Sequence, residues 1–171
     1  GISHEAASLA GTLQLSKLVC VYDDNGISID GEIDGWFTDD TPKRFAAYNW
    51  HVQDNVDGHD PAAIKAALVA AQQDPRPSII CCKTRIGFGS PNKAGTASSH
   101  GSPLGDDEIA LTRESLGWPH EPFDIPDDIY SAWDCRQKGS EAESDWRQRL
   151  AEYHARDAVL AAEFERVIER R

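Results

Sequence analysis

Two polar segments of the sequence carry residue types that could do chemistry. The first, residues 23–28 (Asp-Asp-Asn-Gly-Ile-Ser), is rich in carboxylate and amide oxygens, which hard cations such as Mg²⁺ and Ca²⁺ prefer. An EF-hand is excluded, because Ile27 and Ser28 stand where that loop needs an oxygen ligand and a glycine. One turn cannot complete the octahedral shell of Mg²⁺, so a capped turn with exposed acids stays open as the alternative.

The second segment is a Gly-rich stretch that ends near His100. A histidine that is followed by glycine in a loop can orient or protonate a substrate oxygen near neutral pH. The alternative is a solvated imidazole without a role. Lys83 and Lys93 flank the stretch and could meet a phosphate. The other histidines are expected to be structural or exposed, and His59, just before a predicted helix, is the nearest exception.

The elements that must position these segments follow an alternating pattern. Helices are predicted over residues 3–15, 41–48 and 60–72, with Thr41 and Asp60 as N-caps, and strands over residues 18–22, 50–56 and 78–82. Alternating helices and apolar strands predict an α/β fold with a parallel sheet flanked by helices. Ligands of such sheets bind beyond the carboxyl ends of the strands, which singles out residues 23–30 and 83–100.

The rest of the chain is predicted to be a long loop followed by helices. The loop spans residues 83–105, a length that is usually functional or disordered. Helices are expected over residues 107–116 and 126–133. One longer helix then carries apolar residues from Trp146 to Val167 at helical spacing, and we interpret it as packing or linker-leading structure.

Composition excludes several classes of function. The 171 residues carry a formal charge of −12, which argues against nucleic acid and anionic membranes as partners. A phosphate-bearing ligand would therefore need a local device such as a metal ion. The four cysteines lack metal-site spacing and are expected to be free thiols, mostly buried, in a reducing compartment. The chain has no methionine, and we expect it to be a piece of a longer protein.

Beyond these local patterns, the sequence resembles the transketolase family along nearly its whole length. The resemblance is carried by five ordered motifs, at residues 22–31, 35–40, 57–60, 82–90 and 99–105, together with the segment at residues 111–114. It implies a thiamine diphosphate-binding fold, with residues 1–171 as part of the diphosphate-binding domain and its N-terminal portion missing. Residues 106–171 would then be a helical extension of the same domain that leads to a linker.

The resemblance also assigns roles to single residues. Asn25 matches a side-chain ligand and Ile27 a backbone carbonyl ligand of the metal that grips the cofactor diphosphate, Mg²⁺ or in its place Ca²⁺ or Mn²⁺. Ile86 matches a residue that lines the cofactor. His100 matches a catalytic histidine that reaches cofactor and substrate oxygens. Glu5 matches a helix at the family's dimer interface, whereas Ala97 replaces a histidine that relatives often carry.

The implied function is transfer of a two-carbon ketol unit from a ketose phosphate to an aldose phosphate in the pentose phosphate pathway. A cytoplasmic homodimer that uses thiamine diphosphate and sugar phosphates is expected. Two alternatives stay open. One is a related enzyme, such as a dihydroxyacetone synthase or deoxyxylulose phosphate synthase. The other is a non-catalytic fragment, because the family's Gly-Asp-Gly metal motif is absent, and these residues alone are expected to be inactive.

Overall fold

The protein is described by a computed structural model, which covers residues 1–170 and divides into two compact units. The first unit is Gly1–Pro119, and the second begins at His120. Helix α4 (Asp106–Ser115), which follows the long loop, belongs to the first unit.

A parallel sheet forms the centre of the first unit. Its three strands are β1 (Val19–Asp24), β4 (His51–Asp57) and β5 (Ser78–Lys83), in the order β1-β5-β4. The pairing is parallel on both sides of β5, with Tyr22 opposite Cys81 and Val52 opposite Ile79. The predicted α/β class with a parallel sheet is therefore confirmed. The middle strand β5 is buried from Ser78 to Cys82, as its continuous apolar run indicates.

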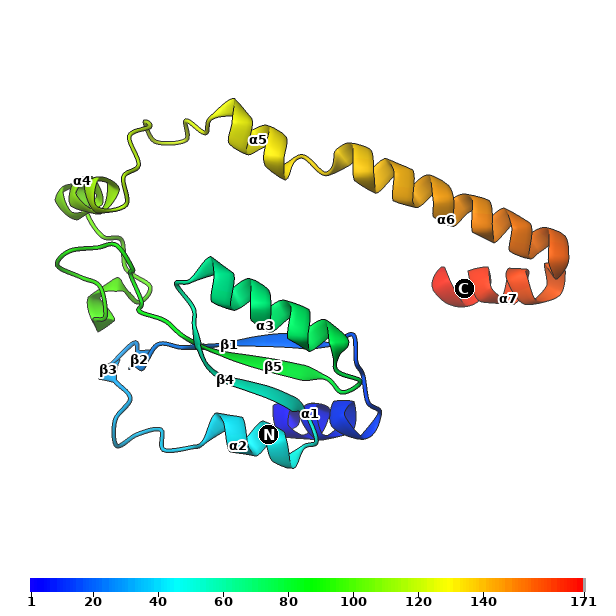
Figure 1. Ribbon diagram of the computed structural model, residues 1–171, viewed down its shortest axis with the longest axis horizontal. Coiled ribbons are helices and arrows are strands. Elements are labelled where there is room, and N and C mark those ends of the chain that lie inside the picture. The colour runs from blue at the N-terminus through cyan, green and yellow to red at the C-terminus, as the bar shows by residue number, and fades with distance from the viewer. Residues whose placement is uncertain (171) are drawn as a thin grey trace. The chain divides into compact units, whose positions relative to one another are not determined.

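Helices cover both faces of this sheet (Figure 1). On one face, α1 (Ile2–Thr12) and α2 (Thr41–Ala47) pack against Ile79 and Cys81 with Trp50, whose Nε1 donates to the Ala7 carbonyl at 2.8 Å. On the other face, α3 (Pro61–Gln73) packs against Ile80 and Cys82. Successive residues of β5 thus face opposite helical layers, which is the alternation expected of a strand.

Side-chain caps begin α2 and α3. Asp60 caps α3 as predicted, because its Oδ1 accepts from the Ala62 amide at 2.8 Å, and Pro61 follows at the first helical position. The predicted cap Thr41 is wrong. Asp40 holds that position, and its carboxylate accepts from the Lys43 amide at 2.9 Å.

Beyond β1 the chain forms a small hairpin, which was not predicted from the sequence. It consists of β2 (Ile27–Ser28) and β3 (Gly31–Glu32). Figure 1 shows this hairpin, the loop that follows β5, and α4 at the carboxyl end of the parallel strands. The long loop contains one 3₁₀ turn, Ala97–Ser99.

The second unit consists of α5 (Asp127–Trp133), α6 (Arg136–Arg156) and α7 (Ala158–Ile168). The single long helix predicted here is wrong, because the chain leaves helical geometry at Asp157, whose φ is −150°. The Asp157 carboxylate accepts from the Leu160 amide at 3.0 Å and so begins a new helix. α7 folds back along α6 (Figure 1), and the rings of Tyr153 and Phe164 meet edge to face.

No helix within residues 1–170 is both long and apolar enough to cross a lipid bilayer.

Candidate functional site

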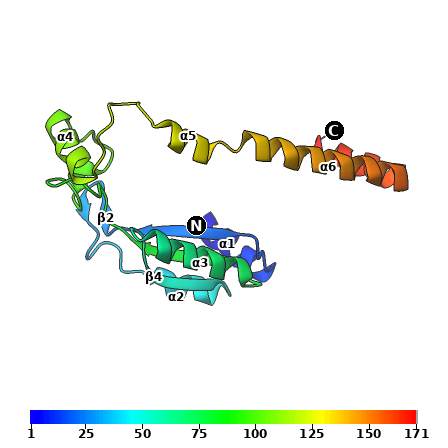
Figure 2. The same cartoon turned by 45° about the horizontal axis from the view of Figure 1, so that its top comes forward.

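The two segments singled out in the sequence start at the same edge of the sheet. β1 and β5 are neighbours in register, so Asp23 lies opposite Cys82 and Asp24 opposite Lys83. The strands end together, and both polar segments leave the sheet at this point (Figure 2). The arrangement is the one in which parallel sheets bind ligands.

Side chains tie the two strand ends together. The Lys83 ammonium pairs with Asp24, and the Thr84 hydroxyl donates to Asp23. The hydrogen bond that the Lys83 ammonium donates to Asp24 raises the pKa of Lys83 above its usual value. Lys93 at the far side of the loop donates to the Leu104 carbonyl at 2.7 Å. Both lysines considered for phosphate are thus engaged within the chain.

Asn25 holds a tight turn directly after β1. Its Oδ1 accepts from the Ile27 amide at 3.0 Å, and Gly26 between them has a φ of 71°. The Asn25 amide group also donates to Asp23 at 3.4 Å. This hydrogen-bonded turn fixes the Asn25 side chain relative to the Ile27 backbone.

The turn lines a cavity of about 310 Å³ whose wall is otherwise formed by Tyr22, Asp23, Asp24, Ile33 and Phe37. The amide oxygen of Asn25 and the carbonyl of Ile27 are hard oxygen donors, which suits a magnesium-like cation. Across residues 1–170, no cluster of three or more His, Cys, Asp and Glu side chains is placed to hold a metal. The turn therefore fits a metal as part of a ligand set and not as a complete cage.

The loop after β5 is braced at its start by His59. The His59 Nε2 accepts from the Arg85 amide at 2.8 Å, and its ring stacks on Phe88 with centroids 4.0 Å apart. Further along, the Ile86 carbonyl accepts from the Gly95 amide at 2.7 Å. The half-buried Ile86 is thus held close to the strand end, and His59 has a positioning role that the sequence alone left open.

A buried carboxylate that sequence reasoning missed organises the middle of this loop. Glu108, in the first turn of α4, is only 6% exposed. It accepts from the Ser90 hydroxyl, from the Asn92 amide at 2.8 Å and from Asn92 Nδ2 at 2.9 Å. These bonds, led by that of Ser90, lower the pKa of Glu108 to about 2. No spacing in the sequence distinguishes Glu108 from its neighbours Asp106 and Asp107.

His100 follows the 3₁₀ turn and exposes its side chain to solvent. Its backbone amide donates to the Ala97 carbonyl at 2.9 Å, whereas its imidazole has no hydrogen-bond partner within residues 1–170. Glu5 is likewise exposed, on α1. The structure thus brings the Asn25 turn and the start of the β5 loop together, and no described hydrogen bond joins His100 or Glu5 to them.

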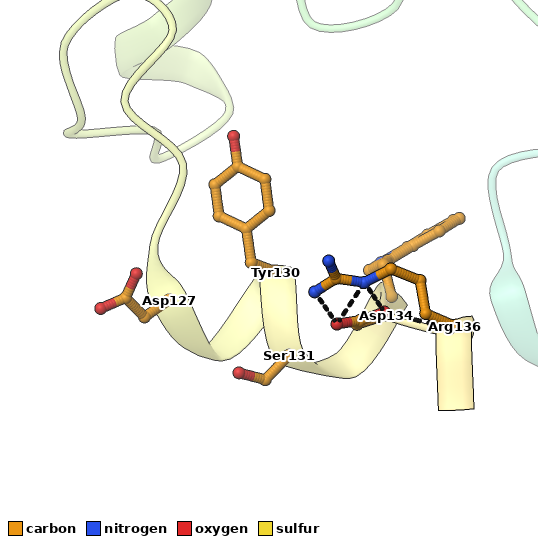
Figure 3. A pocket seen from close by; sticks show the side chains of 6 residues that line it. Asp127, Tyr130, Ser131, Asp134 and Arg136 are labelled. Atoms are coloured by element: carbon orange, nitrogen blue, oxygen red, sulfur yellow. Dashed lines mark hydrogen bonds and ion pairs between the residues drawn. The ribbon is translucent and has the colours of Figure 1, made fainter. Parts of the chain in front are cut away.

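The second unit has a larger depression of about 720 Å³, in which the charged side chains of Asp134 and Arg136 pair with each other (Figure 3). The Arg136 guanidinium grips the Asp134 carboxylate through Nε at 2.9 Å and Nη2 at 2.6 Å. The side chains of Asp127, Tyr130 and Ser131 point away from this pair. The depression is an open surface beside a short helix, and it offers no convergent group for catalysis.

The cysteines behave as expected of structural thiols. All four are free; Cys81 and Cys82 are buried, Cys20 is partly buried and Cys135 is exposed. Burial, with smaller contributions from nearby Asp54 and Asp24, raises the pKa of Cys81 to about 11. A thiol of this kind is a poor nucleophile, which leaves the sheet edge as the candidate site.

Comparison with known proteins decides which family this geometry represents. The family model described as "Transketolase, thiamine diphosphate binding domain" matches residues 1–171. The chain belongs to the transketolase family. The predicted resemblance is therefore confirmed, and the sheet edge is that of a thiamine diphosphate-binding domain.

Curated transketolases match the same span. "Transketolase 2" of Vibrio parahaemolyticus is 60% identical over 166 residues, which is 97% of this chain and 25% of that protein. "Transketolase 2" of Escherichia coli K12 is 59% identical over 167 residues, again 97% of this chain and 25% of the relative. The chain thus spans about a quarter of the length of the curated transketolases it matches.

Solved transketolases share the fold. The Pichia stipitis transketolase in complex with sedoheptulose-7-phosphate superposes with a TM-score of 0.88 at 36% identity, covering 97% of this chain and 25% of that one. The Leishmania mexicana transketolase gives the same TM-score, identity and coverage.

Proposed function

We propose that this chain is the part of a transketolase that binds the diphosphate of thiamine diphosphate through a divalent cation. The whole protein then transfers a two-carbon ketol unit from a ketose phosphate to an aldose phosphate. The observation that carries the proposal is the oxygen-lined Asn25 turn at the carboxyl end of β1, in a chain that matches the family's cofactor-binding domain throughout.

The proposed metal ligands are the Asn25 side-chain oxygen and the Ile27 carbonyl. Mg²⁺ is the proposed ion, with Ca²⁺ or Mn²⁺ able to replace it, because all three accept oxygen ligands. Diphosphate oxygens would fill further positions around the ion. The cation also supplies the positive charge that a chain of net charge −12 needs to hold an anionic cofactor.

When bound, thiamine diphosphate supplies the carbon nucleophile that breaks and remakes the bond next to a ketose carbonyl. Ile86 is proposed to line the cofactor. His100 is proposed as the catalytic residue that also contacts cofactor and substrate. Its exposed imidazole, without a hydrogen-bond partner in the described chain, is free to donate to a substrate oxygen and hold a proton there.

We further propose sugar phosphates as substrates, consistent with the sedoheptulose-7-phosphate named for the Pichia stipitis structure. A cytoplasmic homodimer of the full-length protein is proposed, with Glu5 of α1 at the subunit interface. The exposed apolar side chains of Ile2 and Leu9 on the same helix, and of Leu13 directly after it, support a covered surface there.

The proposed function is tested on the full-length protein with sedoheptulose 7-phosphate as donor and an aldose phosphate as acceptor. We expect ketol transfer that requires both thiamine diphosphate and a divalent cation. His100→Ala should lower kcat by about 100-fold or more, as general acid–base groups contribute, while changing cofactor affinity far less. His154→Ala is the matched control, because His154 lies on α6 and pairs with Glu165 at 3.0 Å.

Two results would contradict the proposal. Transfer only to acceptors other than aldose phosphates would favour a related ketol-transferring enzyme. No transfer by the folded full-length protein, with cofactor and metal present, would favour a non-catalytic role. Unchanged kinetics in His100→Ala would remove His100 from the site while leaving the function in place.

A further inference from the structure

The loop that carries Ile86 and His100 is long and Gly-rich, yet it is docked on α4 at two points. Glu108 in the first turn of α4 receives hydrogen bonds from Ser90 and Asn92. At the other end of α4, Gly89 approaches Leu116 so closely that a Cβ at Gly89 would lie 2.6 Å from Leu116 Cδ2. The two contacts hold residues 89–92 of the loop against the helix.

Hydrogen bonds, linked by short stretches of backbone, lead from Glu108 toward both proposed site residues. Toward Ile86, the Ser90 amide donates to the Gly87 carbonyl at 3.0 Å, and the Ala94 amide donates to the Ser90 carbonyl at 3.3 Å next to the Gly95–Ile86 bond. The position of Ser90 therefore fixes the turn whose Gly95 amide donates to the Ile86 carbonyl.

Toward His100, the connection passes through Lys93 and Thr96. The Lys93 amide donates to the Ser90 hydroxyl at 3.1 Å, and the Thr96 hydroxyl donates to the Lys93 carbonyl at 2.8 Å. The Ser99 hydroxyl then donates to the Thr96 carbonyl at 2.9 Å, immediately before His100. A change at Glu108 therefore reaches His100 through the backbone of its own loop.

We propose that Glu108 is a positioning residue, which clamps residues 90–92 of the loop on α4 and thereby sets where Ile86 and His100 lie at the sheet edge. Burying a carboxylate costs free energy unless hydrogen bonds compensate for the lost water. The partners of Glu108, Ser90 and Asn92, provide that compensation, so the buried charge and the loop hold each other in place. The hydrogen bonds to its charged form, which lower its pKa to about 2, are those of a permanent anion. This inference rests on the proposed function, because it assigns a cause to the placement of its residues.

The experiment compares Glu108→Ala with Asp107→Asn in the full-length protein. Asp107 is the matched control, because it lies in the same first turn of α4, has the same charge and is exposed. We expect Glu108→Ala to lower kcat by about 10- to 100-fold, since small displacements of catalytic groups have such effects. Asp107→Asn should retain the wild-type rate.

A double-mutant cycle with His100→Ala separates positioning from a general loss of structure. If Glu108 acts through His100, then Glu108→Ala should lower kcat little further in a protein that already carries His100→Ala. The fold-losses in kcat of the two single variants should therefore not multiply in the double variant. Losses that multiply fully would overturn the proposal. So would a Glu108→Ala variant with the wild-type rate.

A second readout does not depend on catalysis. Hydrogen exchange of amides in residues 86–100 should accelerate in Glu108→Ala, while the amides of β5 keep their protection. If these loop amides exchange in Glu108→Ala as they do in wild type, the proposal is overturned. This outcome can be read even if the full-length protein shows no ketol transfer, so a failure of the proposed function is distinguishable from a failure of this inference. Should Glu108→Ala not fold, Asn92→Ala removes only the 2.9 Å side-chain bond and is expected to give the same changes to a smaller extent. Wild-type exchange in a folded Asn92→Ala variant would then overturn it.

Discussion

At the scale of single residues, the side chain of Asn25 is oriented by the protein itself. The Ile27 amide and the Asp23 carboxylate hold its two polar ends. A ligand that is already oriented loses little conformational freedom when a metal binds, and this lowers the cost of forming the site. The same turn places the Ile27 backbone next to Asn25, so one short segment presents both proposed oxygen donors.

Glu108 gives a prediction on pH that follows from its pKa. The pKa is about 2 in the folded protein and 4.5 by ordinary reference, so the folded state favours the anion. Its contribution to stability is therefore complete above pH 4.5 and is lost as the pH falls from 4.5 through 2. The difference in unfolding free energy between wild type and Glu108→Gln should be largest near neutral pH. It should decrease as the pH falls from 4.5 to 2.

Urea unfolding of the full-length protein at pH 7, 4.5 and 2.5 measures this difference. Asp107→Asn serves again as the control, and it should show little difference from wild type at any of these values. A gap between wild type and Glu108→Gln that stays constant from pH 7 to 2.5 would show that the Glu108 carboxylate is not held as an anion.

Residue chemistry explains which parts of the site could be predicted. Asn25 and Ile27 stand in a run of oxygen donors after a strand, and a family resemblance assigns them to a metal. Glu108 could not be predicted, because its burial arises when α4 docks on the loop, a contact between segments far apart in sequence. The role of His59 stayed open at the level of sequence for the same reason, since its partner Arg85 is 26 residues away.

At the scale of elements, local patterns predict most helices and strands but not their neighbours. The apolar run of β5 and the proline after Asp60 are local signals, and the structure confirms both. The order β1-β5-β4 is a tertiary property, and it alone brings the two polar segments together. The break at Asp157 escaped prediction, because the apolar spacing continues across it while the Asp157 cap starts a new helix.

The packing of α1 gives a prediction at this scale. A Cβ on Gly11 would lie 1.8 Å from the Tyr48 carbonyl oxygen, so no side chain fits between α1 and the end of α2. Gly11→Ala should lower the unfolding free energy by about 1–3 kcal/mol, the usual cost of forcing extra volume into a packed contact. Thermal or urea unfolding of the full-length protein measures the change.

Gly139 in α6 provides the matched control. A Cβ there would meet nothing within 4 Å, and the residue lies inside a helix like Gly11. Gly139→Ala should raise stability by about 0.5–1 kcal/mol, because alanine has the higher helix propensity. Equal effects of the two substitutions would contradict the close contact between α1 and Tyr48.

At the scale of the whole molecule, the chain carries a cofactor-binding surface within a much longer kind of protein. It spans about a quarter of the transketolases it matches, and its sheet edge provides only part of a metal shell. Its net charge of −12 adds a second constraint, because an anionic diphosphate is repelled unless a cation intervenes. Under the proposed function, we therefore expect metal, cofactor and the remaining ligands to assemble together at the end of β1.

The proposed metal site is tested most directly by a crystal structure of the full-length protein with thiamine diphosphate and Ca²⁺. The anomalous signal of Ca²⁺ locates the ion. We expect the ion about 2.3–2.6 Å from both Asn25 Oδ1 and the Ile27 carbonyl, with diphosphate oxygens in its remaining positions. The peak should be lost or weakened in Asn25→Ala. A fully occupied ion bound elsewhere, with Asn25 bonded only to the Ile27 amide, would contradict the account.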